Sequence, residues 1–170
     1  PRRLRGLLRV RSMTLAGIET EKHERIAEGL DPARQITLLY LHGGGYVAGS
    51  AATHRRMIAN LAWATGADAY VPNYRLAPTD RFPAALDDAT AAYKGLLAAG
   101  VERGRLFVAG DSAGGGLALA LLLRLRDDEE PLPAGAVLLS PYTDLEHTAG
   151  SITEYRNTDY LPGLLIGAGA

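Results

Sequence analysis

The sequence predicts an α/β protein whose mostly parallel sheet is covered by helices on both faces. Short apolar runs at 36–41, 67–71, 106–109 and 136–139 contain little polar alternation, which is typical of strands buried on both sides. Helix-periodic segments separate these runs, so strand and helix alternate along the chain. Glycines follow two of the runs directly, which indicates sharp turns at the ends of those strands.

The first half of the chain is expected to begin with an antiparallel hairpin, because residues 7–15 and 21–27 alternate in polarity. After the run 36–41, Thr53 is expected to cap a helix. The strand 67–71 is expected to stop at Pro72, which has no backbone N–H. The helix that begins near Thr53 is expected to bury one apolar face, formed by Met57, Ile58, Leu61 and Ala62 at helical spacing.

In the second half, Pro83 is expected to open a helix. The strand 106–109 runs into Ser112 and then a helix to about Arg126, which is apolar on nearly every side and is therefore predicted to be buried. A charged loop at 127–133 precedes the last clear strand, which is expected at 136–139. Residues 161–167 are apolar but broken by proline and glycine, and fit either a helix cut short or a frayed end. The helix that begins at Pro83 is expected to have an apolar face formed by Leu86, Ala89, Tyr93, Leu96 and Leu97.

Length and composition restrict the function. The chain of 170 residues is expected to be a single domain, and its net charge of −1 gives no electrostatic basis for binding nucleic acid. It has no cysteine, which excludes disulfides and a thiol nucleophile and is compatible with a cytoplasmic location. No stretch approaches the roughly 20 apolar residues that span a bilayer. There is no initiator Met and no signal peptide, so both ends are interpreted as cut.

The segment Gly110-Asp111-Ser112-Ala113-Gly114 matches the G-x-S-x-G turn that presents a nucleophilic serine. A hydroxyl is a weak nucleophile and needs a base within hydrogen-bond reach. It must also stand clear of the sheet, and flanking glycines leave room for the sharp turn that achieves this. The alternative is a glycine-rich turn with an incidental serine. The position between a strand and an apolar helix favours the nucleophile.

The segment His42-Gly43-Gly44-Gly45 can supply backbone N–H donors to the negative oxygen of a tetrahedral intermediate. Each such donor contributes about 3–4 kcal/mol to catalysis. The alternative is a loop that cradles phosphate. That alternative is disfavoured because the sequence has neither G-K-[ST] nor G-x-G-x-x-G with an acidic residue at the required place. The two motifs together indicate acyl transfer by a serine hydrolase of the α/β-hydrolase type.

Five segments in one order resemble the hormone-sensitive-lipase-like esterases, the bacterial family IV carboxylesterases. The likeness runs from about Arg9 to Leu145. It departs from the usual pattern at Asn73 and at residues 79–81. The segments are His42-Gly43-Gly44-Gly45-Tyr46, Tyr74-Arg75-Leu76-Ala77-Pro78, Phe82-Pro83-Ala84-Ala85-Leu86-Asp87-Asp88, Gly110-Asp111-Ser112-Ala113-Gly114-Gly115 and Ser140-Pro141-Tyr142-Thr143-Asp144-Leu145.

The resemblance implies a cofactor-free hydrolase of short to medium acyl esters that dimerises as the full-length protein. It also implies that the acid and base lie after later strands, so residues 1–170 form a partial catalytic domain without the last strands and most of the cap. We therefore expect little esterase activity from this segment alone. The implied site is Ser112 as nucleophile, Gly44, Gly45 and Ala113 as oxyanion hole, and His42, Gly43 and Asp111 in support.

Other assignments of the titratable residues are weaker. Asp144 and His147 follow Ser112 in the order of a triad, but an acid three residues before its base is more typical of a loop in which the acid makes turn or cap hydrogen bonds. His42 is expected to pin the glycine loop rather than act as base. His23 and His54 are expected at the surface, and Trp63 in the core or a pocket wall. No cluster has metal-ligand spacing.

Two rival functions remain. A serine and an oxyanion loop without a base also fit a non-catalytic module that binds a small ligand. A fragment with no activity of its own fits as well. The residues that follow position 170 discriminate these, because an Asp and a His at later strand ends would indicate an enzyme.

Overall fold

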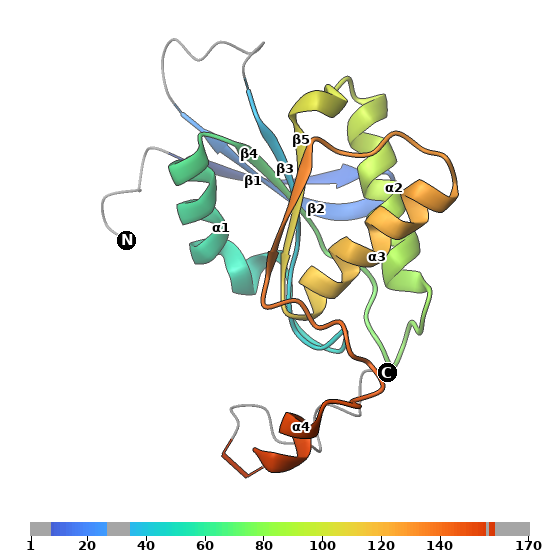
Figure 1. The fold of residues 1–170 in the computed structure, drawn as a ribbon. Helices are drawn as coiled ribbons and strands as arrows, with labels where there is room; N and C mark the ends of the chain where they lie inside the picture. Colours follow the sequence, from blue (N-terminus) through green and yellow to red (C-terminus); the bar gives the residue numbers. More distant parts are fainter. Residues whose placement is uncertain (1–7, 27–34, 156, 159–170) are drawn as a thin grey trace.

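The computed structural model describes residues 8–26, 35–155 and 157–158, which build one mixed sheet in the order β1-β2-β4-β3-β5-β6 (Figure 1). β1 pairs antiparallel with β2, and β2 pairs antiparallel with β4, whereas β4, β3, β5 and β6 are parallel. The predicted α/β class with a mostly parallel sheet is confirmed. The strands are β1 (Leu8–Leu15), β2 (Ile18–Arg25), β3 (Thr37–Leu41), β4 (Asp68–Pro72), β5 (Leu106–Asp111) and β6 (Gly135–Leu139).

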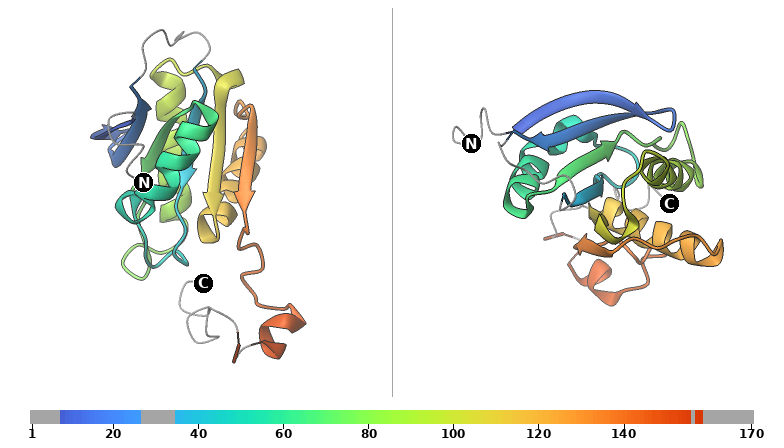
Figure 2. Two further views of the ribbon diagram at one scale, coloured as in Figure 1. Left: turned by 90° about the vertical axis from the view of Figure 1, so that its left-hand side faces the viewer. Right: turned by 90° about the horizontal axis from the view of Figure 1, so that it is seen from above.

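Helices cover both faces of the sheet, as Figure 2 shows. α1 (Ala51–Thr65) packs on one face, and α2 (Ala84–Ala98) and α3 (Ala113–Asp127) pack side by side on the other. The short helices η3 (Arg103–Arg105) and α4 (Gly150–Glu154) precede β5 and follow β6, respectively. Every residue of β3 is buried, because this central strand is covered on both sides.

β3 divides the hydrophobic core in two. Leu38 and Tyr40 contribute to the cluster under α1, while Leu39 and Leu41 contribute to the cluster under α2 and α3. This alternation follows from the two-residue period of a strand. The carboxyl ends of β3 and β5 lie next to each other, because Leu41 pairs with Gly110 in the parallel ladder. The two glycine motifs therefore start from the same edge of the sheet.

Several boundaries differ from the sequence-based expectations. Ser50, not Thr53, is the N-cap of α1, and Thr53 is its capping-box partner three residues later. Pro72 is the last residue of β4 rather than the residue that stops it, since it pairs with Thr20 at the end of the ladder. Pro83 is the N-cap residue of α2. The early hairpin is confirmed within its described part, and residues 161–167 lie outside the described ranges.

Two expectations about burial were wrong. α3 is buried on one side only, through Leu117, Leu121 and Leu125, whereas Leu123 is 43% exposed because no described element covers that side. Trp63 is 39% exposed on the outer side of α1. The predicted face of α1 is buried at Ile58 and Ala62 but not at Met57.

β6 is the last strand in the sheet order, and its side chains are poorly covered. Val137 is 47% exposed and Leu139 is 40% exposed. On the α1 face, an apolar groove of about 220 Å³ lies beside Val137 and is floored by Phe107 and Ala109. β6 therefore forms a poorly covered edge of the described sheet next to apolar surface.

Candidate active site

Ser112 sits on a strained turn between the end of β5 and the start of α3. Its φ of 51° and ψ of −121° lie in a region that non-glycine residues rarely adopt. Three backbone hydrogen bonds hold it there: Ser112 donates its N–H to Leu139 at 2.9 Å, and its carbonyl accepts from Gly116 at 3.0 Å and Tyr142 at 2.8 Å. These bonds hold the strained backbone of Ser112 in place at the junction of β5 and α3.

The flanking glycines are required by close backbone approaches. A Cβ at Gly110 would lie 2.3 Å from the carbonyl oxygen of Gly114. A Cβ at Gly114 would lie 2.1 Å from the carbonyl oxygen of Leu41 and 2.5 Å from that of His42. The first turn of α3 therefore packs directly on the end of β3. This contact brings the serine turn and the glycine loop together.

The glycine loop turns sharply after Gly43. Gly44 and Gly45 have φ values of 132° and 63°, and the carbonyl of Gly44 accepts hydrogen bonds from the N–H groups of Val47 and Ala48 at 3.1 and 3.0 Å. The N–H of Gly43 donates to Asp111 Oδ1 at 2.9 Å. Within the described residues, the N–H groups of Gly44, Gly45 and Ala113 have no protein acceptor.

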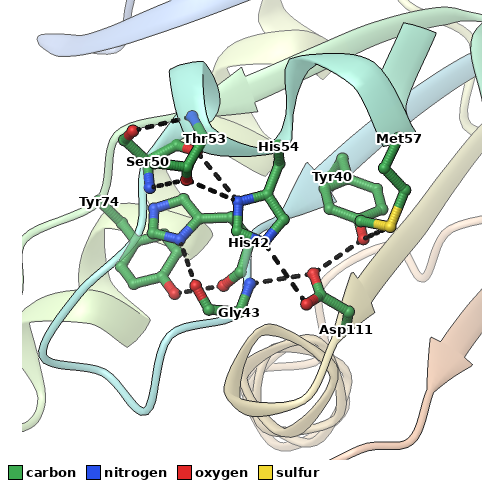
Figure 3. A network of polar contacts seen from close by, with 9 residues as sticks. All are labelled: Tyr40, His42, Gly43, Ser50, Thr53, His54, Met57, Tyr74 and Asp111. Carbon is green, nitrogen blue, oxygen red and sulfur yellow. Dashed lines mark hydrogen bonds and ion pairs between the residues drawn. The ribbon is translucent and has the colours of Figure 1, made fainter.

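Asp111 connects the two motifs through its carboxylate (Figure 3). Besides the Gly43 N–H, its Oδ1 accepts a hydrogen bond from the Tyr40 hydroxyl at 2.8 Å. Its Oδ2 lies 3.5 Å from His54 Nε2. The residue between the glycine and the serine of the turn thus reaches β3, the glycine loop and α1 at once.

His42 is buried against Tyr74, with the two rings stacked at a centroid distance of 4.3 Å. His42 Nδ1 lies 2.9 Å from the carbonyl oxygen of Gly43, and the Tyr74 hydroxyl donates to the His42 carbonyl at 2.5 Å. Burial lowers the pKa of the imidazole, so the neutral form is favoured. This geometry fits a residue that pins the loop.

The structure does not bring together the alternative triad. Asp144 Oδ2 accepts hydrogen bonds from the Thr148 hydroxyl and the Ala149 N–H, both at 3.1 Å, which are turn and cap interactions. His147 Nε2 contacts the Tyr142 hydroxyl instead of the Asp144 carboxylate. In the described part of the chain, no imidazole is hydrogen-bonded to the Ser112 hydroxyl.

Two histidines expected at the surface are not there. His23 is fully buried on β2, 3.5 Å from the Glu21 carboxylate, because α1 packs over this strand. The side chain of His54 is only 19% exposed and points toward Asp111. Sequence reasoning also assigned no role to Tyr40 or to Tyr74. The one available signal was Tyr74, which stands inside a quoted motif.

An apolar cleft of about 520 Å³ opens next to the serine turn. It begins at Tyr46, directly after the glycine loop, and at Gly116 and Tyr142, both of which donate to the Ser112 carbonyl. Ser112 itself does not line it. The far walls come from the start of α2 and the uncovered side of α3, through Phe82, Leu86, Leu119 and Leu123.

Among the residues that the structure describes, no three His, Cys, Asp or Glu side chains are grouped so that they could hold a metal ion. In the same ranges, none of the helices has the length and apolar character needed to cross a bilayer.

The chain is similar in sequence to known hydrolases. A sequence model of the α/β hydrolase fold matches residues 38–164. The chain is 49% identical over 137 residues to an acetyl-hydrolase from Streptomyces hygroscopicus, which covers 79% of this chain and 46% of that protein. It is 36% identical over 154 residues to an esterase from Acinetobacter venetianus, which covers 91% of this chain and 49% of that protein.

The fold is also similar to those of solved esterase structures. An esterase from the bacterial hormone-sensitive lipase family superposes with a TM-score of 0.86 at 39% identity, over 96% of this chain and 55% of that one. The chain therefore spans about half the length of the relatives it matches.

Proposed function

The chain belongs to the α/β-hydrolase fold family, and we propose that it carries the nucleophile and oxyanion hole of a serine carboxylesterase similar to bacterial hormone-sensitive lipase. Ser112 is the nucleophile. Gly44, Gly45 and Ala113 are the oxyanion donors. His42, Gly43 and Asp111 hold the two motifs together.

The observation that supports this most is the strained backbone of Ser112 beside three unpaired N–H groups. A φ of 51° at a serine costs free energy and persists only where the surroundings enforce it. The glycine contacts at positions 110 and 114 bring the turn against the end of β3, from which the glycine loop starts. Fixed donors near a nucleophilic hydroxyl suit a carbonyl carbon that becomes tetrahedral and an oxygen that becomes negative.

The reaction proceeds in two steps. The Ser112 oxygen attacks the ester carbonyl carbon as a base removes its proton, and the tetrahedral intermediate then collapses, so that the alcohol leaves with a proton and an acyl-serine remains. Water then attacks the acyl-serine with the same base, which releases the carboxylic acid and restores the hydroxyl. We propose that the base and its acid partner come from outside this segment, as the family resemblance implies.

We propose short to medium acyl esters as substrates. The relative from Streptomyces hygroscopicus is named an acetyl-hydrolase, and the cleft beside the turn is large enough for a small apolar group. Because its walls are mostly apolar, the cleft favours an uncharged ester over a charged one.

The test is active-site labelling of the full-length protein that contains this segment. A fluorophosphonate probe should label the wild type, and Ser112→Ala should abolish both labelling and hydrolysis of p-nitrophenyl butyrate, by at least about 10³-fold. Ser12→Ala, an exposed serine on β1, is the matched control and should retain both. Labelling that persists in Ser112→Ala would exclude Ser112 as the nucleophile.

A binding module is the second candidate, because the Ser112 hydroxyl has no base among its described neighbours. The same assay separates the two. A full-length protein that folds but is neither labelled nor active would favour ligand binding without hydrolysis. The isolated segment of 170 residues is expected to show little or no activity in either case.

A further inference from the structure

His54 has a place in the site that the proposed function does not use. It lies on the first turn of α1, yet its imidazole points across to the turn that carries the nucleophile, where Nε2 is 3.5 Å from Asp111 Oδ2. The side chain is 19% exposed, and its ring centroid is 5.6 Å from that of His42. It is therefore packed among the groups that hold the glycine loop.

The other edge of the His54 ring is fixed by the N-terminus of α1. Nδ1 lies 2.9 Å from the Thr53 hydroxyl and 3.2 Å from the carbonyl oxygen of Ser50. Ser50 and Thr53 are themselves tied together by the capping box. The imidazole is thus held from behind by a rigid helix end, with Nε2 presented to the carboxylate.

The carboxylate that faces His54 controls the loop. Asp111 Oδ1 receives the Gly43 N–H, and a Cβ at Gly43 would lie 2.3 Å from Asp111 Oδ2, so the loop backbone is packed against both oxygens. The next two residues are glycines, whose backbones are the most permissive of all. Their amides can point at one place only if the loop before them is held from outside.

We propose that His54 is a positioning residue for the oxyanion hole. Its Nε2 lies 3.5 Å from Asp111 Oδ2 and limits the rotation of the carboxylate, which in turn fixes the Gly43 N–H and the direction of the amides at Gly44 and Gly45. The chain of contacts runs from the cap of α1 through β5 to the glycine loop. His54 itself touches no reacting atom. The catalytic part of this inference rests on the proposed esterase function, whereas the structural coupling does not.

The test compares two variants of the full-length protein. His54→Phe keeps a ring but has no donor, and should lower kcat about 10- to 100-fold with KM nearly unchanged, as expected when a transition-state contact is misplaced. His54→Gln offers an N–H at a similar reach and should recover most of kcat. A rise in KM with kcat unchanged, or an equal loss of kcat in both variants, would overturn the proposal.

A second readout is independent of esterase activity. The amide resonance of Gly43, observed with selectively ¹⁵N-labelled glycine, should move in His54→Phe and return toward its wild-type position in His54→Gln. If the full-length protein shows no Ser112-dependent hydrolysis, the proposed function fails, but this resonance still decides whether His54 controls the loop. A Gly43 resonance that is the same in all three proteins would overturn the coupling.

Folding is checked in parallel. If both His54→Phe and His54→Leu unfold while His54→Gln does not, His54 would be required for stability instead of positioning, and the proposal would be wrong.

Discussion

The Asp111 carboxylate accepts the backbone N–H of Gly43 at 2.9 Å, and this bond joins the serine turn to the glycine loop across 68 positions in the sequence. The bonding oxygen also accepts the Tyr40 hydroxyl at 2.8 Å. One oxygen therefore holds two donors from the end of β3. The alignment of the two motifs depends on this atom.

Asp111→Ala is expected to lower the free energy of unfolding by about 1–3 kcal/mol, because it leaves two partly buried donors without an acceptor. Asp111→Asn keeps an oxygen where both donors meet, and should cost much less. Urea denaturation of the two variants measures the difference. Equal losses in both would show that the negative charge, and not the shared acceptor, is what matters.

The approach of α3 to β3 gives a second prediction. A Cβ at Gly114 would lie 2.1 Å from the Leu41 carbonyl oxygen, and backbone atoms cannot yield as a flexible side chain does. Gly114→Ala should therefore cost about 3 kcal/mol or more, or prevent folding.

Gly104→Ala is the matched control for Gly114→Ala. A Cβ at Gly104 has no heavy atom within 4 Å, so its unfolding free energy should change by less than about 0.5 kcal/mol. Thermal melts of both variants test this pair. A Gly114→Ala protein as stable as Gly104→Ala would contradict the close packing.

The parts of the fold that local patterns determine were predictable. Uninterrupted apolar runs located β3, β4 and β5, because a strand covered on both sides has no polar face to alternate. The cap of α1 was misplaced by three residues for a local reason. Ser50 and Thr53 both belong to the capping box, and each side chain bonds to the backbone of the other residue.

The parts that depend on strand order could not be predicted. His23 stands among charged residues on β2, a pattern that predicts an exposed side chain. The antiparallel pairing of β2 with β4 instead places it beneath α1. His54 reads as a surface residue of a helix, and its contact with Asp111 requires α1 and the end of β5 to meet. Glycine spacing predicted the two motifs. It did not predict the side chains that hold them.

The exposed edge of the sheet gives a third prediction, for the isolated chain. Val137 on β6 is 47% exposed beside an apolar groove, and the outer hydrogen-bonding edge of β6 pairs with no described strand. Such an edge promotes association. Sedimentation velocity should show association that increases with concentration, and Val137→Glu should shift the chain toward the monomer.

Leu132→Glu is the control for this association. Leu132 has a similar exposure of 44% but lies in the loop before β6, so a charge there should leave association unchanged. A wild-type chain that stays monomeric at all concentrations would contradict the prediction.

The buried pair beneath α1 gives a prediction about pH. His23 is fully buried, and burial lowers the pKa of its imidazole. The hydrogen bonds from Arg55 lower the pKa of the neighbouring Glu21 carboxyl. In the unfolded chain the His23 imidazole and the Glu21 carboxyl titrate at about 6.5 and about 4.3.

Whether stability rises or falls with pH depends on which state, native or unfolded, binds the proton. As the pH falls below about 6.5, the unfolded chain protonates His23 while the native protein does not, so stability falls with decreasing pH, by up to about 1.4 kcal/mol per pH unit for each such histidine. His42, whose pKa burial also lowers, adds a second contribution of the same sign. Glu21 contributes later, because its stabilisation is lost only as the pH falls below its ordinary pKa.

His23→Leu should therefore reduce the dependence of unfolding free energy on pH between 7 and 5 to about half, since His42 remains. Urea denaturation at a series of pH values in the full-length protein measures this slope. The variant should also gain relative stability at the acidic end, because it removes a buried group that the unfolded chain protonates. A slope equal to that of the wild type would mean that His23 takes up its proton in the native protein as readily as in the unfolded chain, which its burial beneath α1 opposes.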